Sequence, residues 1–291
     1  MSKHKMWPVL LAGSLLIAMT GPASASDWFT SWSQIEATQC YQKGYNYDYQ
    51  IQIIRNSPDR CEGNEETRRW RYNLAMAIHG GEVEPWTDEL VSEINFTDYV
   101  FDMYTRCIYF QANQYVLDVH VQPGTCTLDL GFFDVTINKS NSDLHLTSTD
   151  FDEPGALDMV NDAYSIVSIH GMRDERYTGP SPGHERIVCV GGLNDDMRDG
   201  FISAVENDPL LSPFLKAVDA RDPSLGCPDD LSGTEANNIV NRSPSNPNGG
   251  LQLEFSRTAR DDLFEVGHES ELQRLVVIIQ DVMHAESAEY Q

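Results

Sequence analysis

The sequence predicts an α/β protein whose β-sheet is covered by helices on both faces. Short apolar runs of strand length recur along the chain, and segments with helical spacing of apolar residues lie between them. Two of the runs end at a histidine followed by glycine. Strands that alternate with helices are typical of a sheet buried on both faces, in which ligands bind beyond the carboxyl ends of the strands.

The N-terminus has the layout of a secretory leader. A basic start, Lys3 to Lys5, precedes an apolar run over 6–19 and the small residues Ala23-Ser24-Ala25. This order predicts a signal peptide over residues 1–25, cleaved near Ala25-Ser26, and a secreted or periplasmic protein. An uncleaved anchor is the alternative. Since no later run has the length of a spanning helix, we expect no membrane association after cleavage.

Six cysteines follow the leader, and an even number in an oxidising compartment predicts three disulfides. Each successive pair flanks one local segment, which favours sequential pairing. A zinc-thiolate site is the weaker alternative, because the chain has no CxxC pair. The predicted pairs are Cys40–Cys61, Cys107–Cys126 and Cys189–Cys227.

Charge and length limit the class of protein. The formal net charge is −25, with 45 acidic and 20 basic residues. The acids are scattered, which indicates a solubilising surface, although a cationic partner would also suit them. A nucleic-acid partner is disfavoured because it requires a basic stripe. We expect an N-terminal extension over 26–70, pinned by a disulfide, and one large domain over 71–291.

The first half of the domain contains five predicted elements. RYNLAMAI (71–78) is a strand ending at His79, and TDELVSEI (87–94) is a short helix with acids in its first turn. Residues 111–138 alternate around Pro123-Gly124, which predicts a β-hairpin or a pair of strands. DLHLTST (143–149) alternates like a strand, and residues 152–160 open a helix at Pro154.

The second half repeats the pattern. Strands are predicted over 164–169, ending at His170, over 187–190, and over 251–256. Residues 173–184 and 243–250 are rich in Pro, Gly and polar residues, which predicts loops. Residues 269–286 carry helical periodicity and predict the closing helix.

Groups that bind metals follow the predicted strands. His79 and His170 each end a strand, and Glu84 follows His79 beyond a Gly80-Gly81 turn. Two histidines and one glutamate, with water at the fourth position, form a catalytic zinc set. Such a metal lowers the pKa of its water to about 7. Glu254 is the candidate for the carboxylate that takes the water's proton.

Other interpretations of these residues stay open at this point. Histidines after strands are often structural, and Glu82 could replace Glu84 as a ligand on chemistry alone. A serine hydrolase is disfavoured by the lack of a GxSxG motif. A cysteine nucleophile is disfavoured because each cysteine has an expected partner.

The chain resembles the poly-γ-glutamate hydrolase family of phages and bacteria over residues 71 to about 264. The pieces that carry the resemblance are AIHGGEVEP (77–85), DLHLTSTDFDEP (143–154), YSIVSIHG (164–171), CVGG (189–192), SGTEANNIVNR (232–242) and LQLEFSRTAR (251–260). The resemblance implies an open mixed α/β core similar to that of zinc carboxypeptidases. The N-terminal 70 residues and the hairpin at 111–138 look like additions.

The resemblance also implies a function and a site. It implies zinc held by His79, Glu84 and His170, which favours Glu84 over Glu82, with Glu254 as the acid/base. The implied substrate is the γ-amide bond between glutamates whose α-carboxylates are free. A polyanion of this kind needs cations or amides in the cleft. The candidates are Arg242, Arg257, Arg260 and Asn238, each with a structural ion pair, turn or cap as its alternative.

The expected protein is therefore a secreted zinc hydrolase of poly-γ-glutamate or a related γ-glutamyl polymer. One alternative is a zinc peptidase of other specificity, motivated by the excess of acids. Another is a catalytically silent secreted module whose metal is closed by a fourth ligand. His145 and Asp150 are the residues to check for that ligand, and His145 could instead support a ligand indirectly.

Overall fold

The computed structural model describes residues 29–37, 49–54, 73–96, 113–119, 124–129, 134–139, 145–180 and 186–289. The leader, Cys40, Cys61, Cys107 and the side chain of Cys126 lie outside the described residues, and so do the two disulfides predicted for these four cysteines. Within the described ranges, no helix is both long enough and apolar enough to cross a membrane.

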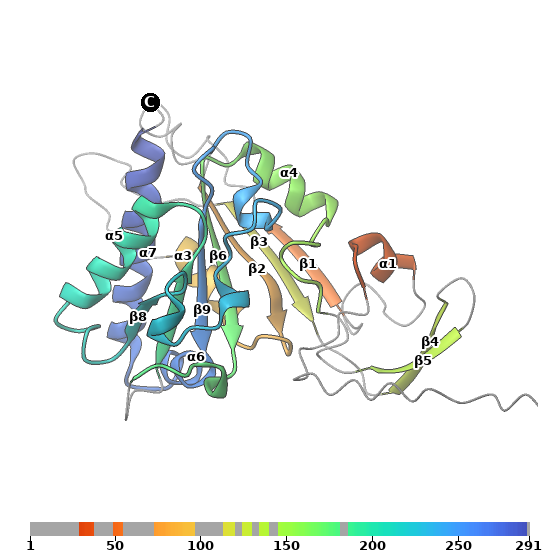
Figure 1. Ribbon diagram of the computed structural model, residues 1–291, viewed down its shortest axis with the longest axis horizontal. Helices are drawn as coiled ribbons and strands as arrows, with labels where there is room; N and C mark the ends of the chain where they lie inside the picture. Colours follow the sequence, from red (N-terminus) through yellow and green to blue (C-terminus); the bar gives the residue numbers. More distant parts are fainter. Residues whose placement is uncertain are drawn as a thin grey trace, which may run out of the picture.

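A seven-stranded mixed sheet forms the centre of the molecule, with the order β1-β3-β2-β6-β9-β7-β8 (Figure 1). The four strands from β3 to β9 in this order are parallel, whereas β1 and β7 run antiparallel to their inner neighbours. The prediction of an open mixed α/β sheet is confirmed. Its strands are β1 (Tyr49–Ile54), β2 (Asn73–Gly81), β3 (Asn113–Val119), β6 (Ser165–Met172), β7 (Ile187–Gly191), β8 (Lys216–Asp219) and β9 (Leu251–Ser256).

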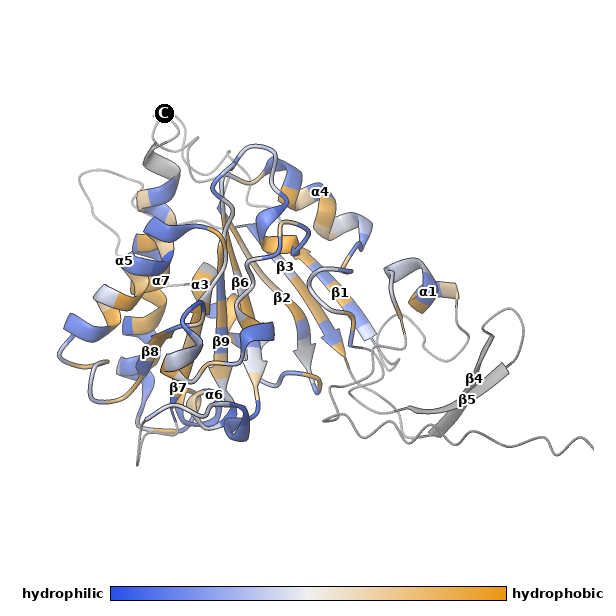
Figure 2. Ribbon diagram, viewed as in Figure 1, coloured by the Kyte–Doolittle hydropathy of each residue, from blue (hydrophilic) through white to orange (hydrophobic). Residues whose placement is uncertain are grey.

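Helices cover both faces because the side chains of a strand alternate between them. On β2, Ala75 and Ala77 face one core, and Leu74, Met76 and Ile78 face the other. Apolar residues are concentrated on these central strands (Figure 2). The first face packs against α3 (Thr87–Phe96), α5 (Asp195–Asn207), α6 (Arg257–Leu263) and α7 (Glu269–Glu289), and the second against α1 (Trp32–Ala37) and α4 (Pro154–Asp162).

Local sequence determines where several of these helices begin. The Glu153 side chain accepts a hydrogen bond from the Ala156 amide at 2.7 Å, and Pro154 occupies the first turn of α4. The Asn194 side chain accepts one from the Met197 amide at 2.9 Å and caps α5. Such caps satisfy amides that have no partner inside the helix. Glu153 is therefore the N-terminal cap of α4.

The predicted pairing at 111–138 was wrong in its first strand. β3 does not pair with the next strand but inserts between β1 and β2, because its side chains are almost all buried. The separate hairpin consists of β4 (Gly124–Asp129) and β5 (Asp134–Lys139). The edge strand β1 comes from the expected N-terminal extension, so this segment contributes to the main sheet.

The strand predicted at 143–149 is also wrong for the residues described there. Residues 145–147 form no strand, and residues 148–150 form a turn. The backbone carbonyls of Ser148 and Thr149 accept hydrogen bonds from the Arg242 guanidinium at 3.4 and 2.5 Å. The Ile239 amide also donates to the Ser148 carbonyl at 2.8 Å. The backbone carbonyls of this segment are therefore satisfied by the Arg242 side chain and the Ile239 amide. They do not need the neighbouring strand that the alternating pattern suggested.

The structure agrees with the remaining predicted strands, with the helices predicted at α3, α4 and α7, and with the loop at 243–250. The loop predicted at 173–184 includes the 3-10 turn η4 (Asp174–Arg176). The sequence analysis did not predict α1, β1, α5, α6 or β8. The predicted disulfide between Cys189 and Cys227 is confirmed, with an S–S distance of 1.99 Å. It joins β7 to the segment that leads into another 3-10 turn, η6 (Asp229–Leu231).

Candidate metal centre and buried carboxylate

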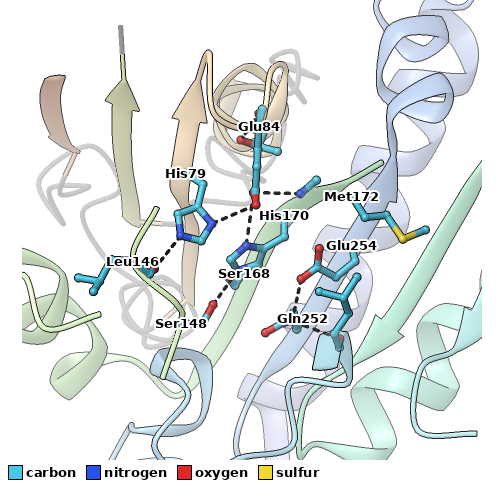
Figure 3. Close-up of polar contacts among 12 residues, drawn as sticks. His79, Glu84, Leu146, Ser148, Ser168, His170, Met172, Gln252 and Glu254 are labelled. Atoms are coloured by element: carbon cyan, nitrogen blue, oxygen red, sulfur yellow. Dashed lines mark hydrogen bonds and ion pairs between the residues drawn. The ribbon is translucent and has the colours of Figure 1, made fainter. Parts of the chain in front are cut away.

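His79 lies near the carboxyl end of β2, where the register with β3 shifts between Ala77 and Gly80. Its ring is buried and fixed at both nitrogens. The Nε2 atom lies 2.8 Å from the Leu146 carbonyl oxygen, and Nδ1 lies 3.0 Å from Glu84 Oε1 (Figure 3). Because a carbonyl only accepts hydrogen bonds, Nε2 carries the proton and Nδ1 presents its lone pair when the ring is neutral.

Glu84 reaches the histidines because the chain folds back after β2. The Glu84 amide donates to the His79 carbonyl at 2.8 Å, and the Thr87 hydroxyl donates to the Glu84 carbonyl at 2.8 Å. The buried carboxylate spans two partners, since Oε2 lies 3.4 Å from His170 Nδ1 and accepts from the Gly171 amide at 2.9 Å. Glu82, the alternative ligand, is exposed and outside this cluster.

His170 completes the group from β6. Its Nε2 lies 2.9 Å from Ser168 Oγ and 3.3 Å from Ser148 Oγ, which leaves Nδ1 facing Glu84. One ligand atom from each of His79, Glu84 and His170 lies within 4.8 Å of the others, and all three residues are buried. The structure therefore brings together the three residues that the sequence pointed to.

The electrostatics of the cluster depend on burial and on close charge pairs. Burial lowers the pKa of His79, which favours its neutral ring in spite of the Glu84 charge. For His170, Glu254 and Glu84 outweigh burial and raise the pKa. Burial alone would raise the pKa of Glu84, but His79 and His170 hold it well below its usual range.

These contacts fit a metal ion. When His79 is neutral, its Nδ1 lone pair faces a carboxylate oxygen 3.0 Å away, and a cation bound by both atoms would stabilise this arrangement. Two imidazole nitrogens and one carboxylate are a donor set that suits zinc. The Leu146 carbonyl supplies the outer hydrogen bond that orients a ligand histidine. Across the described residues, no fourth His, Cys, Asp or Glu joins the cluster.

His145 lies next to the cluster and is not one of its members. Its ring is 4.3 Å from the His79 ring, at an interplanar angle of 31°. The ring is half-buried, and Asp150 lies in the adjacent turn. This arrangement does not provide the closing ligand that a purely structural zinc site would need.

Glu254 is the second carboxylate of the site. It lies opposite His170 across the parallel β6–β9 pair and is buried, with a relative exposure of 4%. Its Oε1 accepts a hydrogen bond from Gln252 Nε2 at 2.9 Å, and Gln252 Oε1 accepts one from Asn238 Nδ2 at 2.8 Å. Burial raises the pKa of Glu254 to about 7; Glu84 adds to this rise, and His170 and Arg176 oppose it. A carboxyl group with this pKa can exchange protons near neutral pH.

The predicted substrate-binding residues make contacts within the chain. Arg242 donates to the backbone carbonyls of Asn237, Thr149 and Phe151 at 2.5 to 2.7 Å. Asn238, as described, donates to Gln252. These two residues therefore hold the loops beside the site, and a role for them in substrate binding stays a prediction.

The two arginines of α6 differ in exposure. Arg257 pairs with Asp261 at 2.8 Å on the surface. Arg260 is buried and donates to the carbonyls of Pro85 at 2.6 Å and Met172 at 3.4 Å. It packs so tightly on Gly171 that a Cβ added there would lie 2.3 Å from the guanidinium carbon. Arg260 thus braces the Glu84 turn against the end of β6, and its role in substrate binding also stays a prediction.

Sequence reasoning missed two supporting side chains, Gln252 and Ser168. Each lies two residues before a candidate functional residue on the same strand, Gln252 before Glu254 and Ser168 before His170. Because alternate residues of a strand share a face, the period of two could have identified both. Arg176, whose charge acts on Glu254, was missed because it follows β6 in a segment predicted to be a loop.

The fold and the site together define a class: an α/β protein with a buried His–Glu–His cluster and a neighbouring carboxylate at one edge of a mixed sheet. Residues 113–285 match the family described as poly-gamma-glutamate hydrolase, which is more than half of the chain. The chain therefore belongs to the poly-gamma-glutamate hydrolase family. The matched region includes His170 and Glu254 and begins after His79 and Glu84.

Relatives from Bacillus subtilis (strain 168) show the same likeness. The SPbeta prophage-derived UPF0714 protein YoqZ is 28% identical over 193 residues, 66% of this chain and 51% of YoqZ. The UPF0714 protein YndL is 25% identical over 239 residues, 82% of this chain and 72% of YndL. The chain thus spans only about half the length of YoqZ.

Two solved structures share the fold. A bacteriophage poly-gamma-glutamate hydrolase aligns with a TM-score of 0.51 and 24% identity, covering 84% of this chain and 89% of the phage protein. Zinc-free apo YndL aligns with a TM-score of 0.57 and 20% identity, covering 88% and 96% of the two chains.

Proposed function

We propose that the protein is a secreted zinc-dependent hydrolase that cleaves γ-glutamyl amide bonds in poly-γ-glutamate or a related anionic polymer. The observation that carries the proposal is the convergence of His79 Nδ1, His170 Nδ1 and the Glu84 carboxylate next to Glu254. Membership of the hydrolase family supports the reaction class. A zinc-free form described for the similar YndL supports the choice of metal, and the leader-like N-terminus supports secretion.

The residues divide the chemical work. His79, Glu84 and His170 would hold the zinc, and the Leu146 carbonyl keeps the His79 proton on Nε2. Zinc held there would supply activation of water at neutral pH and polarisation of the amide carbonyl. Glu254 takes the proton of the attacking water and delivers it to the leaving amine. Because Gln252 donates to Oε1, Oε2 is the oxygen that would take up the proton.

A single assay tests this function. The purified protein is analysed for metal and incubated with poly-γ-glutamate, with and without a chelator, and the products are sized. We expect about one zinc per chain, shortening of the polymer, loss of activity with the chelator and its return with zinc. Less than a tenth of a zinc per chain, with no activity restored by added metal, would contradict the proposal.

A zinc peptidase of other specificity is the second candidate. The net charge of −25 repels a polyanion, and the contacts of Arg242, Arg257 and Arg260 are within the chain. The test is to offer α-linked peptides to the same metal-loaded protein. Faster cleavage of α-linked peptides than of the polymer would favour this candidate. A catalytically silent module would need a fourth ligand, and among the described His, Cys, Asp and Glu residues only His79, Glu84 and His170 form the cluster.

A further inference from the structure

Two 3-10 turns lie on the Glu254 side of the site. The turn η4 follows directly on β6, the strand of His170, and η6 follows Cys227. An ion pair joins them, in which Arg176 Nη2 lies 2.6 and 2.7 Å from the two carboxylate oxygens of Asp230. We refer to η4, η6 and this ion pair as the arginine wall.

Three contacts fix the arginine wall beside Glu254. The Cys189–Cys227 disulfide anchors the chain just before η6, and Cys189 lies directly opposite Glu254 across β7 and β9. Gln252 Nε2, which donates to Glu254, also lies 3.3 Å from the Leu231 carbonyl at the end of η6. The Leu231 side chain packs against the core cluster that contains Met172 and both of these cysteines.

The Arg176 guanidinium can receive a ligand. Its side chain is 41% exposed, and its guanidinium hydrogen bonds with the described residues, both to Asp230, use Nη2 alone. Among the described residues, Nε and Nη1 therefore keep donors for an incoming carboxylate. By contrast, Arg242 and Arg260 direct their donors at backbone carbonyls. The charge of Arg176 also acts on Glu254, where it opposes the rise in pKa that burial causes.

We propose that Arg176 is a specificity-determining residue that binds a free α-carboxylate of a glutamyl unit next to the amide held at Glu254. This assignment rests on the proposed function. An arginine presents several fixed N–H donors to a carboxylate, which suits recognition of an anion at a defined position. Asp230 orients the guanidinium from one side and, as an anion, competes with the substrate for it.

The test compares steady-state kinetics of the zinc-loaded variants Arg176→Ala, Arg176→Lys and Asp230→Ala on poly-γ-glutamate. We expect Arg176→Ala to raise KM roughly 10- to 100-fold with little change in kcat, because it removes binding shared by ground and transition states. Arg176→Lys should lose less, since it keeps the charge. Asp230→Ala should leave KM unchanged or lower it, because a competing anion is gone.

Two controls separate substrate binding from a structural role. Arg221→Ala removes another partly exposed arginine paired with carboxylates, those of Asp195 and Asp219, and should leave KM unchanged. Esterifying the α-carboxylates of the polymer should erase the difference between wild type and Arg176→Ala. Zinc content and melting temperature are measured for every variant.

The outcomes distinguish this assignment from the function on which it rests. If zinc-loaded wild type does not cleave the polymer, the function is wrong and the assignment falls with it. If wild type cleaves but Arg176→Ala keeps its KM within twofold, only the assignment is overturned. An equal rise in KM for Arg176→Ala and Asp230→Ala, or an equal loss on the esterified polymer, would also overturn it, because the pair would then act only to stabilise the wall.

Discussion

Cys189 lies directly opposite Glu254 across the antiparallel β7–β9 pair, and His170 lies opposite Glu254 on the other side. Side chains of directly opposed residues share one face of a sheet. The disulfide at Cys189, the Glu254 carboxylate and the candidate metal ligand His170 therefore lie side by side on the same face of the sheet. The covalent cross-link to Cys227 is thus adjacent to the proposed acid/base.

The choice between Glu84 and Glu82 as metal ligand can be tested by isosteric substitution. Glu84→Gln removes the charge from a buried carboxylate between two histidines, whereas Glu82→Gln alters an exposed side chain. We expect Glu84→Gln to lose most of its zinc during dialysis and Glu82→Gln to keep it. Metal analysis by mass spectrometry is the measurement, and equal zinc in both variants would remove Glu84 from the site.

Glu254→Gln should keep zinc and lose kcat by roughly 100- to 10,000-fold, the range typical for a removed general acid/base. The amide retains the shape of the side chain but cannot take a proton. Metal content and turnover of the same preparation are compared. Near-normal turnover would place the base on another residue.

Gln252→Ala should reduce kcat about tenfold at unchanged zinc content, because Glu254 then loses the donor that orients Oε1. The matched control is Gln280→Ala. It deletes another buried amide, which donates from α7 to the Ile94 carbonyl of α3 at 2.8 Å. Both variants should lose stability, but only Gln252→Ala should lose turnover per folded molecule. A similar kcat in the two would make Gln252 purely structural.

Removal of the disulfide by Cys189→Ala with Cys227→Ala should lower the free energy of unfolding by about 2–4 kcal/mol. The bond closes a loop with a sequence separation of 38 residues, which restricts the unfolded chain. Urea unfolding of wild type with and without a reductant, and of the double variant, measures the effect. Identical midpoints in all three samples would show that the cross-link adds no stability.

The ion pair of Asp208 with Arg274 predicts a pH-dependent contribution to stability. Asp208 accepts hydrogen bonds from the Leu210 and Leu211 amides at 3.0 Å and from Arg274 Nε at 2.5 Å. Burial works to raise its pKa, but these partners outweigh it and lower the pKa. A depressed folded-state pKa gives stability that is present above the unfolded value, about 3.9, and is lost as pH falls through the folded value.

Asp208→Asn should therefore be less stable than wild type by about 1 kcal/mol at neutral pH, and the difference should shrink as the pH falls below the unfolded-state value toward the folded-state pKa. Urea unfolding of both proteins from pH 7 down to about pH 3 measures this difference. A difference that is constant with pH would mean that the charge of Asp208 is not responsible.

Part of the site follows directly from strand periodicity. His79 and His170 are predictable because each comes at the carboxyl end of an apolar run, and parallel strands bring such ends to one edge. The position of Glu84 is different, because it depends on backbone hydrogen bonds in a turn that periodicity does not describe. For this reason the sequence alone did not decide between Glu84 and Glu82 as the metal ligand.

The misread elements have a common physical cause, which is partners distant in sequence. The sheet position of β3 depends on β1 and β2, on either side of it. The turn at 148–150 depends on Arg242, more than ninety positions later. A sequence also does not show which backbone carbonyls a guanidinium will meet, so the contacts of Arg242 and Arg260 within the chain could not be predicted.

The order of the central strands also determines when the site can form during folding. His79 and His170 are 91 positions apart and meet only after β2 and β6 pair, and Glu254 is added when β9 docks on β6. Contacts this distant close slowly, because the loop entropy is lost before the contacts form. The three candidate metal ligands come together only when β2 and β6 pair, so a metal that binds them would depend on prior formation of the central sheet.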